Sequence, residues 1–97
     1  MYKAITLQPA HDDFNRILDY WEQFSISSLR HFLEEYDKCV LRIQENPFMY
    51  QVYEYDEELR RAVFNEYLII YEFDEHNKMI KIYRIIHGKI NTGKNIR

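Results

Sequence analysis

The hydrophobic pattern of this chain changes its period at Asn46-Pro47, and this change restricts the fold more than any other sequence feature. Before it, apolar residues recur every three or four positions, as on one face of a helix. After it, Val, Ile, Tyr and Phe dominate short segments, as in strands. Because the residue before a proline is pushed out of the helical region, a helix should end here. The sequence therefore predicts an α+β fold with a helical first half and a strand-rich second half.

The first half predicts two amphipathic helices after a short opening strand. Apolar residues at helical spacing lie between positions 14 and 24 and again between 29 and 43. The segment 25–28, Ser-Ile-Ser-Ser, favours helix caps over helix interiors and predicts a four-residue connection. Helices joined by so short a connection form an antiparallel hairpin. The opening strand is predicted over residues 2–7, before Pro9 marks a change of element.

The second half predicts three consecutive antiparallel strands, over residues 59–64, 67–74 and 79–87. Polar connections of hairpin length, 65–66 and 75–78, separate them. The expected order is β-α-α-β-β-β, with the helical hairpin packed on one face of the C-terminal antiparallel sheet.

Alternation along the last predicted strand assigns its side chains to faces. The two-residue period places Ile80, Ile82 and Ile86 on one face, together with Arg84. An arginine among apolar residues needs a charged partner, either a carboxylate elsewhere in the fold or an external anion.

The length and composition predict a single domain over residues 1–97, with 91–97 as a flexible tail. A hydrophobic content of 46% can supply a core without disulfides, and the lone Cys39 has no partner for one. No apolar run approaches the roughly 18 residues of a membrane helix, and the start lacks a signal-peptide core. We therefore expect a cytoplasmic protein with no membrane partner.

Several kinds of chemistry are not expected. With 2 glycines the chain has no phosphate-binding loop, and its 4 histidines do not stand at metal-ligand spacing. No cofactor or metal is predicted. Cys39 has no activating neighbour in the sequence and is expected to be a small buried apolar residue.

Charge is divided along the chain. Residues 76–97 contain six Lys or Arg and no Asp or Glu, whereas residues 1–75 contain seven basic and sixteen acidic residues. A basic end on an acidic body indicates a face that meets an anion or an acidic partner, although a solvated basic tail is the simpler alternative.

Four residues on the predicted strands are candidates for a functional site: Arg60, Arg61, Arg84 and His87. Guanidinium groups bind phosphate oxygens through paired hydrogen bonds, and a histidine exchanges protons near neutral pH. Such a group is suited to holding a nucleic-acid backbone or to assisting phosphodiester cleavage. The structural alternative is ion pairing of Arg60 and Arg61 with the acidic residues at 54–58.

Three segments carry a family resemblance: Leu59-Arg60-Arg61-Ala62-Val63, Asn65-Glu66-Tyr67-Leu68-Ile69-Ile70-Tyr71 and Ile80-Lys81-Ile82-Tyr83-Arg84-Ile85-Ile86-His87-Gly88. Together with the helical hairpin, they resemble the RelE/ParE superfamily of bacterial type II toxins. The last segment is similar to the Ile-x-Arg-Ile-Leu-His-Gly ending typical of ParE-like members.

The resemblance implies the toxin of a toxin–antitoxin operon, associated with growth inhibition and plasmid stabilisation and held inactive by a cognate antitoxin. RelE-like members cut messenger RNA on the ribosome, and ParE-like members poison DNA gyrase. Gly88 is followed by Lys89-Ile90-Asn91, where a nuclease of the histidine–tyrosine type would place its tyrosine. This favours a ParE-like gyrase poison over an endoribonuclease, and a divergent non-toxic interaction module is the third alternative. Whether the chain is an enzyme stays open.

Site residues follow from the two target classes. In the nuclease reading, the catalytic candidates are Arg60, Arg61, Arg84 and His87. In either reading, the candidates for target binding are Lys81, Arg84, His87 and Lys89. An excess of apolar side chains beyond what two helices cover predicts an amphipathic antitoxin helix with acidic residues facing the basic last strand, and homodimerisation is the competing use of that surface.

Overall fold

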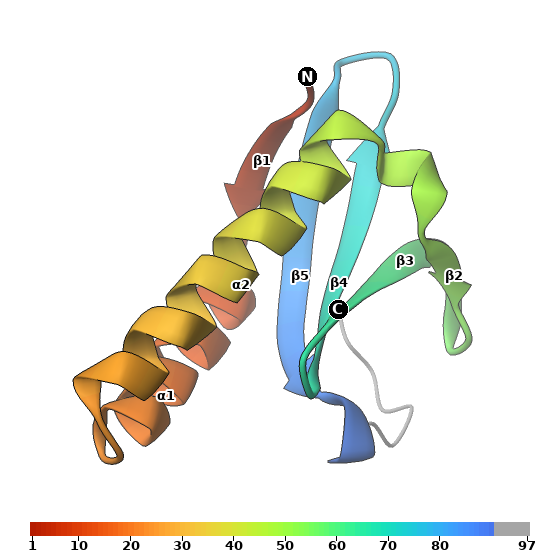
Figure 1. Ribbon diagram of the computed structural model, residues 1–97. Helices are drawn as coiled ribbons and strands as arrows, with labels where there is room; N and C mark the ends of the chain where they lie inside the picture. Colours follow the sequence, from red (N-terminus) through yellow and green to blue (C-terminus); the bar gives the residue numbers. More distant parts are fainter. Residues whose placement is uncertain (91–97) are drawn as a thin grey trace.

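Two helices cover one face of a twisted five-stranded sheet in the computed structural model, which describes residues 1–90 (Figure 1). The α+β architecture predicted from the sequence is confirmed. The predicted flexible tail, 91–97, lies outside the described residues. The elements are β1 (Lys3–Thr6), α1 (Gln8–Glu22), α2 (Ile26–Glu45), β2 (Gln51–Tyr53), β3 (Asp56–Phe64), β4 (Tyr67–Asp74) and β5 (Met79–His87), with 3-10 turns at Pro47–Met49 and Gly88–Ile90.

The helical hairpin forms as predicted, and its connection is shorter than expected. Ser25 caps α2, because its Oγ accepts a hydrogen bond of 3.0 Å from the backbone N–H of Ser28. The helix therefore begins at Ile26, and only residues 23–25 connect α1 to α2. At the far end, Asn46 leaves the helical region directly before the proline, with φ −153°. Among the described helices, none has the length and hydropathy that crossing a membrane requires.

The sheet differs from the predicted one at both edges. Its strand order is β1-β5-β4-β3-β2, with β1 parallel to β5 and the other neighbours antiparallel, so the sheet is mixed. The first of the three predicted strands begins at Asp56 rather than Leu59, and β2 was not expected. β2 has only 3 residues, too few to show a two-residue period.

The face assignment along β5 was wrong for Arg84 and Ile86, because Arg84 pairs with Ile70 of the second cluster whereas Ile82 pairs with Tyr71 of the core. Ile80 and Ile82 pack in the core beneath the helices, but Ile86 packs against the separate cluster around Leu68 and Ile70. The cause is a register shift in the β4–β5 ladder: Tyr71 pairs with Ile82 and Ile70 pairs with Arg84, which leaves an extra residue between them. One inserted residue reverses the alternation that follows it.

The core between helices and sheet is rich in aromatic side chains from both halves of the chain. Phe32 of α2 lies against Phe64 and Tyr67, with ring centroids 5.7 Å and 5.5 Å away. Tyr71 is fully buried, and its hydroxyl donates a 2.7 Å hydrogen bond to the carbonyl of Pro47. This bond ties the turn that follows α2 to the centre of the sheet.

Replacing Tyr71 with Phe should therefore lower the free energy of unfolding by about 1–2 kcal/mol, because the buried Pro47 carbonyl loses its donor. Chemical denaturation measures the change. Tyr20→Phe is the matched control: Tyr20 is exposed, so its hydroxyl is solvated and the loss should stay within about 0.5 kcal/mol. Equal effects of the two substitutions would contradict the assigned role of the Tyr71 hydroxyl.

Candidate functional site

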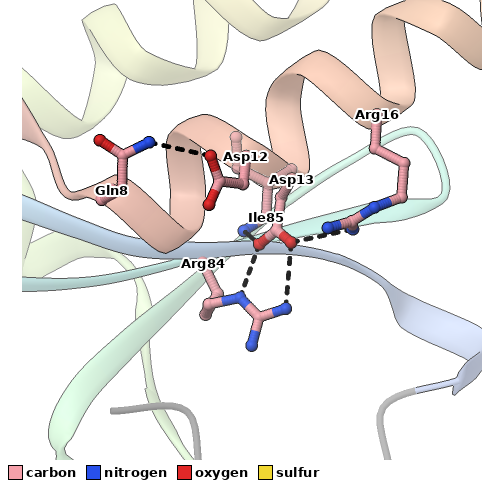
Figure 2. A network of polar contacts seen from close by, with 6 residues as sticks. All are labelled: Gln8, Asp12, Asp13, Arg16, Arg84 and Ile85. Carbon is pink, nitrogen blue, oxygen red and sulfur yellow. Dashed lines mark hydrogen bonds and ion pairs between the residues drawn. The ribbon is translucent and has the colours of Figure 1, made fainter.

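A buried carboxylate on α1 holds the last strand in place. Asp13 accepts two hydrogen bonds from the Arg84 guanidinium, at 2.6 Å from Nε and 3.0 Å from Nη2 (Figure 2). It also accepts the backbone N–H of Ile85 at 3.0 Å and a contact of 3.1 Å from Arg16 Nη1. Of the two partners expected for Arg84, a carboxylate elsewhere in the fold and an external anion, the structure shows the carboxylate.

The topology explains why a carboxylate is needed at this point. β1 pairs with β5 only as far as Ile82, and the chain then turns into α1, which lies along the same edge. Without a neighbouring strand, the N–H of Ile85 needs another acceptor. The Asp13 side chain provides one, where a further strand would have offered a backbone carbonyl.

The surroundings of Asp13 act on its pKa in opposite directions. Burial raises it, but the Arg84 hydrogen bonds and charge, the Ile85 N–H and Arg16 outweigh burial, so the pKa of the Asp13 carboxyl lies below its usual value of 3.8. The same pairing raises the pKa of the Arg84 guanidinium. Asp13 is ionised at neutral pH.

Arg60 and Arg61 also contact internal partners. Arg60 Nη1 donates to the carbonyls of Phe48 and Tyr50, at 3.0 Å and 2.7 Å, and its guanidinium lies 5.5 Å from the centre of the Phe73 ring. Arg61 donates through Nε and Nη2 to the Gln51 side-chain carbonyl, at 3.3 Å and 2.9 Å. Both arginines thus hold β2 and the turn before it against β3.

His87 stands at the end of β5 in a defined hydrogen-bonding state. Its Nδ1 accepts the backbone N–H of Lys89 at 3.2 Å, and its Nε2 lies 3.1 Å from Glu66 Oε2. The neutral tautomer with hydrogen on Nε2 satisfies both contacts. The His87 ring also meets the Tyr67 ring edge to face, with centroids 5.6 Å apart.

The candidate residues do not converge on one point. Arg61, Ile70 and Arg84 are successive cross-strand partners, so the two arginines stand two strands apart, about 10 Å between backbones. Lys81 lies three residues before Arg84 on β5, and His87 three residues after it. Lys81 and Lys89 are exposed. The arrangement places the cations Lys81 and Arg84 along β5 and a separate contact between His87 and Glu66 at the end of the strand.

Two residues of this region were missed by sequence reasoning. Asp13 stands three residues after Ala10 and four before Ile17, so it falls on the apolar face of α1. An acidic residue on a buried helix face needs a cationic partner, and that signal was present in the sequence. Glu66 lies in a two-residue turn and gave no comparable signal.

Other reactive groups are inert or dispersed. Burial raises the pKa of the Cys39 thiol to about 11, so the expectation of a small buried residue is confirmed. Within residues 1–90, no three His, Cys, Asp or Glu side chains are placed to hold a metal ion together.

Comparisons with known proteins place this geometry in context. The family model described as "ParE toxin of type II toxin-antitoxin system, parDE" matches residues 5–92. Among solved structures, the fold is similar to a chain in the toxin–antitoxin complex RelBE2 from Mycobacterium tuberculosis, with a TM-score of 0.60 and 15% sequence identity. That match covers 89% of this chain and 96% of the other. No curated protein matches the sequence.

The Asp13–Arg84 pair generates a stability prediction. Asp13→Asn should lower the free energy of unfolding by about 2–3 kcal/mol, because it leaves the Arg84 charge uncompensated; the cost is reduced by the partial exposure of Arg84. Asp12→Asn is the control, since the exposed Asp12 contacts only the Gln8 side chain in the network of Figure 2. Its effect should be below about 0.5 kcal/mol. Urea titration of both variants measures the difference.

Stability should also fall in acid through Asp13. Because the folded pKa lies below the unfolded one, Asp13 stabilises the fold above pH 4 or so, and this contribution is lost as the pH falls through the folded pKa. The gap in unfolding free energy between the wild type and Asp13→Asn should therefore narrow between about pH 5 and pH 2. A gap that stays constant over this range would show that the Asp13 charge does not matter.

Proposed function

Because the chain belongs to the ParE toxin family of type II toxin–antitoxin systems, we propose that it is a cytoplasmic toxin that poisons DNA gyrase. Its residues for contacting the target are Lys81 and His87 on β5 and Lys89 in the turn that follows, and Arg84 holds β5 in place. A cognate antitoxin neutralises it.

One observation carries the choice of gyrase over messenger RNA. Arg60 and Arg84, two of the candidate catalytic cations, are held by Phe48, Tyr50 and Asp13 of the chain itself. A nuclease needs cations that contact the phosphate and its leaving group during reaction. Cations that instead bind the chain's own backbone and carboxylates fit a toxin that acts by binding.

A ribosome-dependent endoribonuclease is the second candidate, and the His87 environment supports it. The hydrogen bonds from Lys89 N–H and to Glu66 orient the ring, as expected of a general base or acid. In that case Arg61, Lys81 and Lys89 would hold the RNA phosphates, and growth arrest would come from message cleavage.

The antitoxin is expected to cover apolar surface and basic charge together. Large apolar side chains are exposed along the β2 edge of the sheet, at Phe48, Met49, Val52, Tyr55 and Val63. β2 is the outermost strand on this side. An amphipathic antitoxin helix followed by an extended segment would bury these side chains, and its acidic residues would pair with the cations of β5.

Expression of the chain without antitoxin tests the function. Growth arrest with accumulation of gyrase–DNA cleavage complexes supports the proposal, and cleavage of translated messages supports the second candidate. Unaffected growth would contradict both toxin readings and would support the third alternative, a non-toxic interaction module.

Substitutions test the residues. Each of Lys81→Ala, His87→Ala and Lys89→Ala should weaken target binding roughly ten- to a hundredfold, since a lost hydrogen bond to a charged group costs about 1.5–3 kcal/mol. Lys38→Ala, a cation paired with Glu35 on α2, is the control and should retain full toxicity. Thermal unfolding of each variant shows whether weaker target binding comes from the missing side chain or from a destabilised fold.

A further inference from the structure

The loop end of the helical hairpin exposes a second apolar surface. Tyr20, Phe24 and Ile26 are 50%, 60% and 76% exposed. The rings of Tyr20, Trp21 and Phe24 pack against one another in edge-to-face and tilted arrangements, with centroids 5.1–5.7 Å apart. We call these four residues the hairpin tip. Exposed apolar patches of this kind usually mark a contact surface.

A hollow of about 370 Å³ opens beside the hairpin tip. Its walls include three aromatic side chains, Trp21, Phe32 and Tyr67, and its rim includes His31 and Glu66. The Trp21 indole N–H donates to the Tyr67 hydroxyl at 3.0 Å, which fixes one wall. The hollow is large enough to receive one or two large apolar side chains.

The hairpin tip is well separated from the apolar β2 edge. α2 has 20 residues and so extends about 30 Å, with Ile26 at its start and Phe48 and Met49 just past its end. A partner docked along β2 therefore leaves the hairpin tip uncovered.

We propose that the hairpin tip and its hollow form a self-complementary interface, through which two copies of this chain associate about a two-fold axis. Phe24 and Ile26 of each copy enter the hollow of the other. One chain carries both the projecting side chains and the hollow, side by side, which is the arrangement that an isologous contact requires.

Charge supports the same occupant. Near the tip, exposed Asp19 and Glu22 stand on α1, whereas exposed Arg30 stands on α2, one turn before the exposed Glu34. A two-fold arrangement that sets the end of one α1 beside the start of the partner's α2 pairs Glu22 with Arg30. The tip supplies only part of the roughly 800 Å² per partner that a standard interface buries, so we expect a weak, micromolar dimer.

Sedimentation of the purified full chain over a wide concentration range tests the interface. Trp21 is the sole tryptophan and lines the hollow, so its fluorescence should shift over the same concentrations. Phe24→Asp and Ile26→Asp should each raise the dimer Kd at least tenfold. Met49→Asp, an equally exposed residue near the other end of α2, should leave it unchanged.

Charge reversal tests the two-fold arrangement. Glu22→Arg and Arg30→Glu should each weaken the dimer, and the double variant should recover it; circular dichroism confirms that every variant is folded. A chain that stays monomeric at all concentrations overturns the proposal. So does a dimer that Phe24→Asp leaves intact, or one that the double reversal fails to recover. None of these readouts depends on the toxin's target.

Discussion

The Asp13 carboxylate joins α1 to β5 through groups 71 and 72 positions away in the sequence. An ionised carboxylate in the interior is costly unless donors surround it. Here Arg84, Ile85 and Arg16 supply four N–H groups. The interaction therefore ties α1, and with it the helical hairpin, to the last strand.

The basic residues of the second half fall into two groups. Arg60 and Arg84 stabilise the fold, because each is held by oxygens of the chain itself. Lys81 on β5 and Lys89 in the turn that follows remain exposed. The basic residues thus include some that stabilise the fold and others that stay exposed to solvent.

Features set by neighbouring residues could be predicted from the sequence, whereas those set across the sheet could not. Ser25 and Pro47 bound α2 through local geometry, so the helices followed from spacing and caps. An arginine among apolar residues indicated that Arg84 needs a charged partner. The identity of that partner, Asp13, follows only from the fold that brings the two residues together. The inserted residue in β5 has no Gly or Pro to mark it, and so the alternation was extended past it to Ile86. The contact of His87 with Glu66 depends on the turn between β3 and β4, whereas its bond from the Lys89 N–H is local.

The parallel pairing of β1 with β5 has a consequence for the order of assembly. β1 is synthesised first, yet its partner in the described sheet is the strand made last. The helices can form during synthesis, but β1 has no pairing strand and Asp13 has no Arg84 partner until residues 79–87 have been made. Contacts between distant segments slow folding, because loop closure precedes any gain from packing. A product of interrupted translation that ends before Met79 therefore has neither the completed sheet nor the basic last strand.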